Sequence, residues 1–74
     1  GSANAQYNLG IMYAKGSGVS EDNMMAYIWL NLAGSNGLDV SQPKGILGKI
    51  LSQEEKSEAQ RLSRQMKKNN PDIY

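Results

Sequence analysis

The first third of the chain carries apolar positions at helical spacing. They fall at i, i+4, i+7 and i+8, which places them on one face and predicts a helix over about residues 3–14. The positions are Ala5, Leu9, Met12 and Tyr13. Gly10 lies beside this face, and a glycine inside a helix costs about 1 kcal/mol relative to alanine. We therefore expect Gly10 to permit close approach of a second helix, because it has no side chain in the way.

A short glycine-rich loop separates this helix from a second one. Gly16 and Gly18 supply the tight bends after the first helix. We expect Ser20 to cap the next helix, which then starts near residue 21 with two acidic residues in its first turn. Its wide apolar stripe consists of Met25, Ala26, Ile28, Trp29, Leu30, Leu32 and Ala33. A stripe of this width predicts contact with more than one neighbour, and Asn36 followed by Gly37 ends the helix.

The hairpin has a specific pattern of fixed positions, L-G-x-x-Y-x-x-G-x-G-V-x-x-D-x-x-x-A-x-x-W-x-x-x-A-x-x-x-G, which runs from Leu9 to Gly37. It resembles the Sel-one-like repeat, a relative of the tetratricopeptide repeat, over residues 5–37, about half of the chain. The chain departs from the family at Met25, where a basic residue is usual, and at Gly34, where a second alanine is usual. The resemblance implies a helical hairpin that stacks on neighbouring repeats into a solenoid.

The second half of the chain predicts two further helices. Ser41 or Gln42 begins the third, whose apolar face contains Ile46, Leu47, Ile50 and Leu51. A capping box from Ser52 to Glu55 opens the fourth, a mostly polar helix over about residues 53–68. Such a polar helix is typical of the terminal unit of a repeat array. We therefore expect an all-α fold, a fragment of an α/α helical-hairpin solenoid with about four helices.

These patterns divide the chain into four segments. They are a scar of an expression tag (residues 1–2), the Sel-one-like repeat hairpin (3–37), a degenerate repeat that forms a C-terminal cap (38–68) and a flexible tail (69–74).

Composition excludes several function classes. The 74 residues include no cysteine and no histidine, so disulfides, thiolate metal sites and the commonest general base at neutral pH are absent. The net charge of +1 gives the whole chain no strong attraction to nucleic acid or an anionic membrane. No apolar run approaches the roughly 20 residues that span a bilayer. We expect no cofactor and no metal.

Candidate chemistry along the chain has simpler structural explanations. Gly16 and Gly18 lack the third glycine of a dinucleotide-binding loop, because Glu21 stands at that position. Glu21 and Asp22 are neighbours in sequence and point apart on a helix, so they do not form a catalytic carboxylate pair. The basic side chains near the end of the fourth helix are favourable next to its C-terminus for local reasons and are accompanied by glutamates, so nucleic-acid binding is the least favoured reading. The chain is therefore predicted not to be an enzyme.

The predicted function is recognition of a protein or peptide by an adaptor or scaffold that helps to assemble a complex. In solenoids of the type that the resemblance implies, the first helices line the concave side. There the chain presents a strip of polar and apolar residues, which we expect to bind the partner. The strip consists of Asn4, Tyr7, Asn8 and Ile11. The same strip also fits a packing face for an upstream repeat.

The alternative is a purely structural role as the C-terminal cap of a longer array. In that case an exposed side of the second helix, formed by Met24, Met25 and Ile28, makes the excised cap self-associate into a homo-oligomer. The resemblance fits a bacterial envelope or secreted setting, and eukaryotic members exist too, so the localisation stays open.

Overall fold

The structure is a computed structural model that describes residues 2–70, and within this range it contains four α-helices and no strand. The helices are α1 (Ala3–Lys15), α2 (Asn23–Ser35), α3 (Ser41–Ile50) and α4 (Gln53–Asn69). The predicted all-α fold is confirmed. The first residue of the predicted tail, Asn69, is the last residue of α4, and residues 71–74 of that tail lie outside the described residues, as does Gly1 of the expected tag scar. Ser2, the other residue of that scar, accepts a hydrogen bond from the Ala5 amide at the start of α1.

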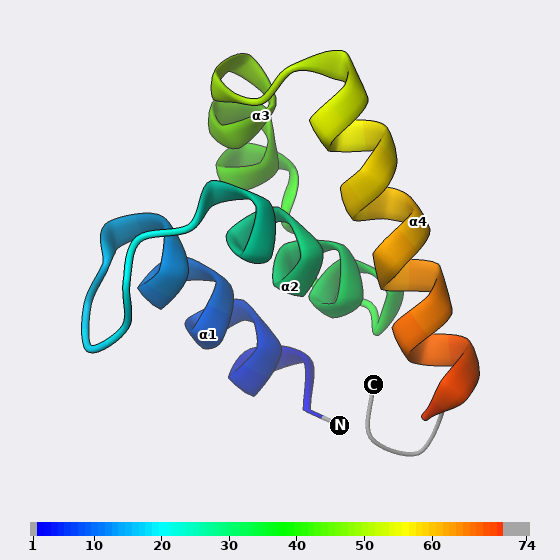
Figure 1. Cartoon of the computed structure of the whole chain (residues 1–74). Helices are drawn as coiled ribbons and strands as arrows, with labels where there is room; N and C mark the ends of the chain where they lie inside the picture. The colour runs from blue at the N-terminus through cyan, green and yellow to red at the C-terminus, as the bar shows by residue number, and fades with distance from the viewer. Residues whose placement is uncertain (1, 71–74) are drawn as a thin grey trace.

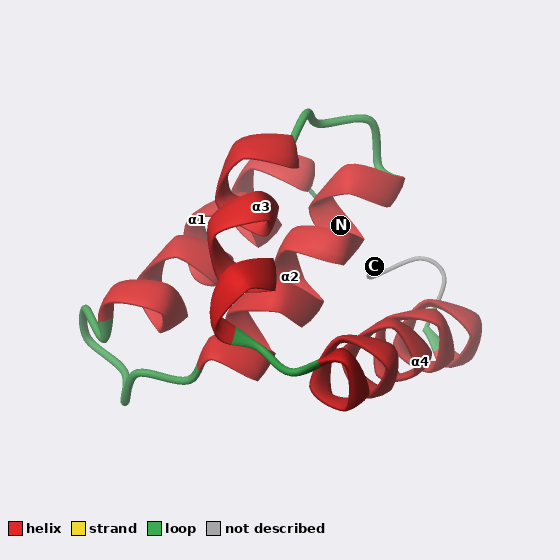
Figure 2. Ribbon diagram, turned by 90° about the horizontal axis from the view of Figure 1, so that it is seen from above, coloured by secondary structure: helices red, strands yellow, loops and turns green. Residues whose placement is uncertain are grey.

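Helix α2 occupies the centre of the molecule and contacts each of the other three helices (Figure 1). Seen from above, α3 lies over the α1–α2 hairpin and α4 lies to one side of α2 (Figure 2). The buried cluster is accordingly drawn mainly from α2, and its two largest fully buried side chains are Leu30 and Leu32. The wide apolar stripe of the sequence thus meets several neighbours, as predicted. Trp29 is only partly buried and packs against the edge of this cluster.

The α1–α2 hairpin is closed by a contact at Gly10. A methyl group placed on Gly10 would lie 3.1 Å from Leu30 Cγ and 3.2 Å from the backbone oxygen of Ala26, closer than ordinary contact. The expected close approach of the two helices is therefore confirmed. Gly16 ends α1 in the left-handed conformation with φ 70°, as predicted, and the loop then projects away from the other helices (Figure 1).

The predicted N-terminal cap of α2 is wrong by two residues. Asp22, not Ser20, is the cap, and its carboxylate accepts a hydrogen bond of 3.1 Å from the Met25 amide. The Asp22 amide donates to the Tyr13 carbonyl over 3.0 Å, which ties the cap to the end of α1. Serine and aspartate are comparably good caps, so this link across the hairpin accounts for the choice of Asp22.

The core face of α1 also differs from the prediction. The buried residues of α1 are Gln6 and Gly10, whereas Ala5 and Met12 are exposed and Leu9 is half-buried. Gln6 Oε1 accepts a hydrogen bond of 2.8 Å from Asn36 Nδ2 at the end of α2. The buried face of α1 is therefore centred on Gly10 and not on the apolar positions. The reason is that α2 comes closest where α1 has no side chain.

Close packing also fixes the connection from α2 to α3. Gly37 takes a positive φ of 100° after the end of α2, as predicted for that glycine. A methyl group on Gly34 would lie 3.0 Å from Val40 Cγ2, so the glycine that departs from the family pattern makes room for Val40. Lys44 Nζ of α3 lies 5.2 Å from the centre of the Tyr27 ring of α2, within range of a cation–π interaction.

Helix α4 begins with the predicted capping box and packs against α2 at an angle (Figure 1). Ser52 Oγ accepts from the Glu55 amide over 3.1 Å, and the Glu55 carboxylate accepts from the Ser52 amide over 2.9 Å. Ser63 is buried and receives a hydrogen bond of 3.3 Å from Asn31 Nδ2, while Lys67 Nζ donates to Ser35 Oγ over 2.9 Å. The contacting residues advance in the same chain direction along both helices, and the N-terminal ends of the two helices line the same groove.

Candidate partner-binding surface

An apolar groove runs between α1 and α3 above the middle of α2, with a volume of about 270 Å³. We call it the isoleucine groove because Ile11 lies on one wall and Ile46 and Ile50 on the other. Its remaining lining residues are Ala14, Lys15, Glu21, Asn23, Leu30, Pro43 and Leu47. Ile46 and Ile50 are each 60% exposed, although the sequence places both on the apolar face of the third helix. A short helix that rests on one neighbour buries only one side, here Leu47 and Leu51, and leaves these two isoleucines in solvent.

The four residues of the predicted binding strip on α1 differ in burial. Asn4 and Asn8 are exposed, whereas Tyr7 and Ile11 are partly buried and pack against the core. Only Ile11 lines the isoleucine groove, and the other three continue its stripe along α1 at spacings of three, four and seven residues. The strip therefore meets the groove only at Ile11, and its role in binding stays a prediction.

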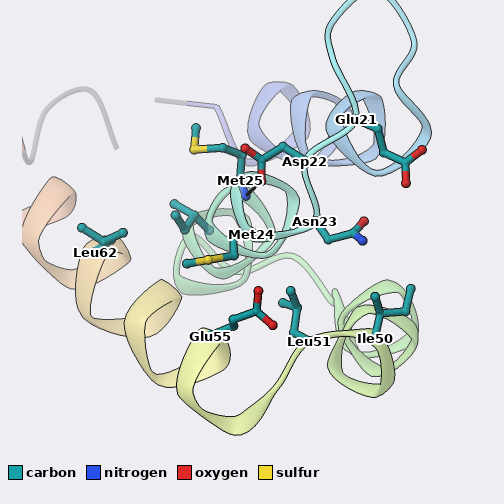
Figure 3. Close-up of a pocket in the computed structure, with 10 residues that line it drawn as sticks. Glu21, Asp22, Asn23, Met24, Met25, Ile50, Leu51, Glu55 and Leu62 are labelled. Carbon is teal, nitrogen blue, oxygen red and sulfur yellow. Dashed lines mark hydrogen bonds between the residues drawn. The ribbon is translucent and has the colours of Figure 1, made fainter.

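A second, more open groove of about 590 Å³ lies where the N-termini of α2 and α4 meet the end of α3 (Figure 3). We call it the methionine groove because Met24 and Met25 of α2 line it. Its other apolar lining residues are Ile28, Ile50, Leu51 and Leu62. The polar residues around it are Glu21, Asp22, Asn23 and Glu55, so it contains three carboxyl groups and no lysine or arginine.

The predicted self-association side of α2 is only partly available. Met24 and Met25 are half-buried and line the methionine groove, but Ile28 is 2% exposed and belongs to the buried cluster. The expectation of an exposed Ile28 is therefore wrong. The reason is that α4 packs against α2 at this residue, where the Ser63 hydroxyl donates to the Ile28 carbonyl. Self-association itself stays a prediction.

Two exposed carboxyl groups have shifted pKa values for local reasons. Hydrogen bonds from the Ser41 hydroxyl and amide hold the pKa of the Asp39 carboxyl below its usual value. The Arg61 guanidinium, which forms an ion pair with Glu58, likewise lowers the pKa of the Glu58 carboxyl. Neither residue lines a groove, and both interactions stabilise helix structure. Within residues 2–70 there is no cluster of three or more His, Cys, Asp or Glu side chains suited to hold a metal ion.

The α1–α2 hairpin and the two helices packed on it form the all-α fold of a helical-repeat fragment. Residues 3–38 match the family model described as Sel1 repeat. This segment, which contains α1, the glycine loop and α2, is a Sel1 repeat, and the predicted family is confirmed. No curated protein and no solved structure matches the chain.

Membership of this family bears on the class of function. Sel1 repeats are interaction repeats that mediate contacts between proteins, not catalytic domains. In the part of the chain that the structure describes, none of the helices combines the length and apolar character needed to cross a bilayer. The family gives no partner, so the site has to be inferred from the surface.

Proposed function

We propose that this chain is a non-catalytic part of an adaptor or scaffold, and that it binds a protein or peptide partner in the isoleucine groove. The observation that carries the proposal is the exposure of Ile46, at 60%, on the wall of a groove that is otherwise mostly apolar. Exposed large apolar side chains around a concave surface are typical of interaction sites rather than of ordinary solvated faces.

The composition of the groove indicates how the partner would bind. Ile11, Leu30 and Leu47 form apolar walls and floor, while Asn4 and Asn8 extend the same side of α1 with groups that donate and accept hydrogen bonds. A peptide that places apolar side chains in the groove and runs along α1 would therefore gain both burial and hydrogen bonds.

The experiment is capture from a lysate of the source organism with three immobilised baits: the wild-type chain, Ile46→Glu and Ser57→Glu. Ser57 is exposed on α4 and lines neither groove, so its substitution adds the same charge elsewhere. We expect a partner that the wild-type and Ser57→Glu baits retain and that Ile46→Glu loses, because a carboxylate in an apolar contact must be desolvated. All three baits must show the same helical circular dichroism. A partner retained equally by all three would disprove the assignment to this groove.

A further inference from the structure

We propose that the methionine groove is a second binding site, and that it takes a partner segment in which large apolar side chains are flanked by lysine or arginine. The methionine groove adjoins the isoleucine groove and shares Glu21, Asn23 and Ile50 with it, but its methionines and its partner chemistry are its own. The inference does not depend on the proposed function.

The charge around the groove favours a cationic partner. Glu21, Asp22 and Glu55 contribute three carboxylates at neutral pH, and no basic side chain lines the groove. The N-termini of α2 and α4 oppose them with only about half a positive charge each, so the local balance stays negative although the whole chain is +1. Within residues 2–70 the ion pair that forms is Arg61 with Glu58, so none of the three groove carboxylates is neutralised by a cation there.

The hydrogen bonds of these carboxylates leave room for a partner. Asp22 uses one carboxylate oxygen, Oδ1, for the Met25 amide, and Glu55 uses Oε1 for the Ser52 amide. Each retains a second oxygen, and Glu21 is exposed. A lysine or arginine could therefore bind here without breaking either helix cap.

The apolar residues that line the groove would contact apolar side chains of the partner. Met24 and Met25 are half-buried, and Figure 3 shows Met24 facing into the space between α2 and α4 with Leu62 opposite. Methionine is unbranched and polarizable, so it adapts to apolar side chains of different shape. A volume of about 590 Å³ holds a few large side chains, within the about 300–1,000 Å³ usual for binding pockets. Apolar side chains beside basic ones therefore match both the lining and the charge.

The test is an NMR titration of the chain, carrying ¹³C-labelled methionine methyl groups, with the capped peptide Lys-Arg-Leu-Leu-Arg-Lys. The described residues provide four methionines, and only Met24 and Met25 line the groove, so Met12 and Met66 serve as internal controls. We expect saturable shifts at Met24 and Met25 that persist in Ile46→Glu. The peptide Glu-Glu-Leu-Leu-Glu-Glu should cause no such shifts.

Two variants with the same change in net charge distinguish binding in the groove from non-specific electrostatic attraction of the peptide. The triple variant Glu21→Gln, Asp22→Asn and Glu55→Gln removes the groove carboxylates and keeps residues that can cap both helices. The control Asp39→Asn, Glu54→Gln and Glu58→Gln changes net charge equally at residues that do not line the groove. We expect the first to weaken peptide affinity about 3- to 100-fold, the effect of losing three exposed ion pairs, and the control to change it much less.

Three results would overturn the proposal. Equal weakening by both triple variants would show binding to overall charge, and shifts confined to Met12 or Met66 would place the peptide elsewhere. Self-association of the wild-type chain in sedimentation, abolished by the groove variant, would assign the groove to a second copy instead. Retention of a captured partner by Ile46→Glu would disprove the assignment to the isoleucine groove but would not alter the methionine shifts expected here, so failure of the two proposals can be distinguished.

Discussion

Leu30→Ala is expected to lower the free energy of unfolding by about 2–5 kcal/mol, the usual range for a buried leucine that leaves a cavity. Leu30 is completely buried in α2, faces Gly10 of α1 and forms part of the lining of the isoleucine groove. At about 0.05–0.15 kcal/mol per residue, a chain of this length is held by only about 4–11 kcal/mol. The substitution therefore removes a large share of the stability, measured by urea unfolding followed by circular dichroism.

The matched control for this prediction is Ile46→Ala. It also truncates a large aliphatic side chain, but Ile46 is 60% exposed, so the free energy of unfolding should change by no more than about 0.5 kcal/mol. If Leu30→Ala were no more destabilising than Ile46→Ala, the assignment of Leu30 to the centre of the core would be refuted.

Gly10→Leu is expected to destabilise the chain by at least about 1–3 kcal/mol, the usual cost of forcing extra atoms into a packed contact. Leucine is a better helix former than glycine, so local propensity alone predicts a gain of somewhat under about 1 kcal/mol. We expect the steric contact to outweigh this gain in the free energy of unfolding. The first added carbon would already lie 3.2 Å from the Ala26 backbone oxygen, and a backbone atom cannot move away as a flexible side chain can. The measurement is again urea unfolding.

Gly45→Leu provides the comparison within the same molecule. Gly45 lies inside α3, and a carbon added there meets no atom within 4 Å. Propensity should therefore dominate and stabilise the chain by about 0.5–1 kcal/mol. Opposite signs for the two glycines are the expected result; destabilisation of similar size at both positions would argue against the α1–α2 contact.

Local signals predicted the ends of most helices. The capping box at Ser52 and Glu55, the left-handed Gly16 and the turn at Gly37 all occur where the sequence places them, because each depends on residues within one turn. The cap of α2 was missed because it depends on the hydrogen bond between Asp22 and Tyr13, which joins residues that only the closed hairpin brings together.

The orientation of α1 could not be read from its apolar positions. Hydrophobic spacing assigned Ala5, Leu9 and Met12 to the core, but the buried residues of this helix are Gln6 and Gly10, neither of which contributes to an apolar pattern. The close contact at Gly10 and the hydrogen bond between Gln6 and Asn36 therefore determine which face of α1 is buried, and the apolar spacing does not. As a result α2 leaves Ala5 and Met12 exposed.

The candidate site was predicted only in part. Ile11 was identified on the first helix, but the groove depends on the position of α3, and no local pattern distinguishes the exposed Ile46 from the buried Leu47 next to it. Of the residues that line the methionine groove, the sequence had indicated Met24 and Met25 as part of an exposed side of the second helix. The charge of this groove was missed because Glu21, Asp22 and Glu55 come together only when the N-terminal ends of α2 and α4 line the same groove.

Photo-crosslinking at position 46 shows whether a partner lies in the isoleucine groove. The chain carrying Ile46→p-benzoylphenylalanine is irradiated with the captured partner, beside a chain with the same substitution at the exposed Gln60 of α4. We expect a covalent adduct from position 46 and none from position 60, because only the first lines the groove. A partner that is captured but cross-links at position 60 and not at position 46 would contradict the assignment to this groove.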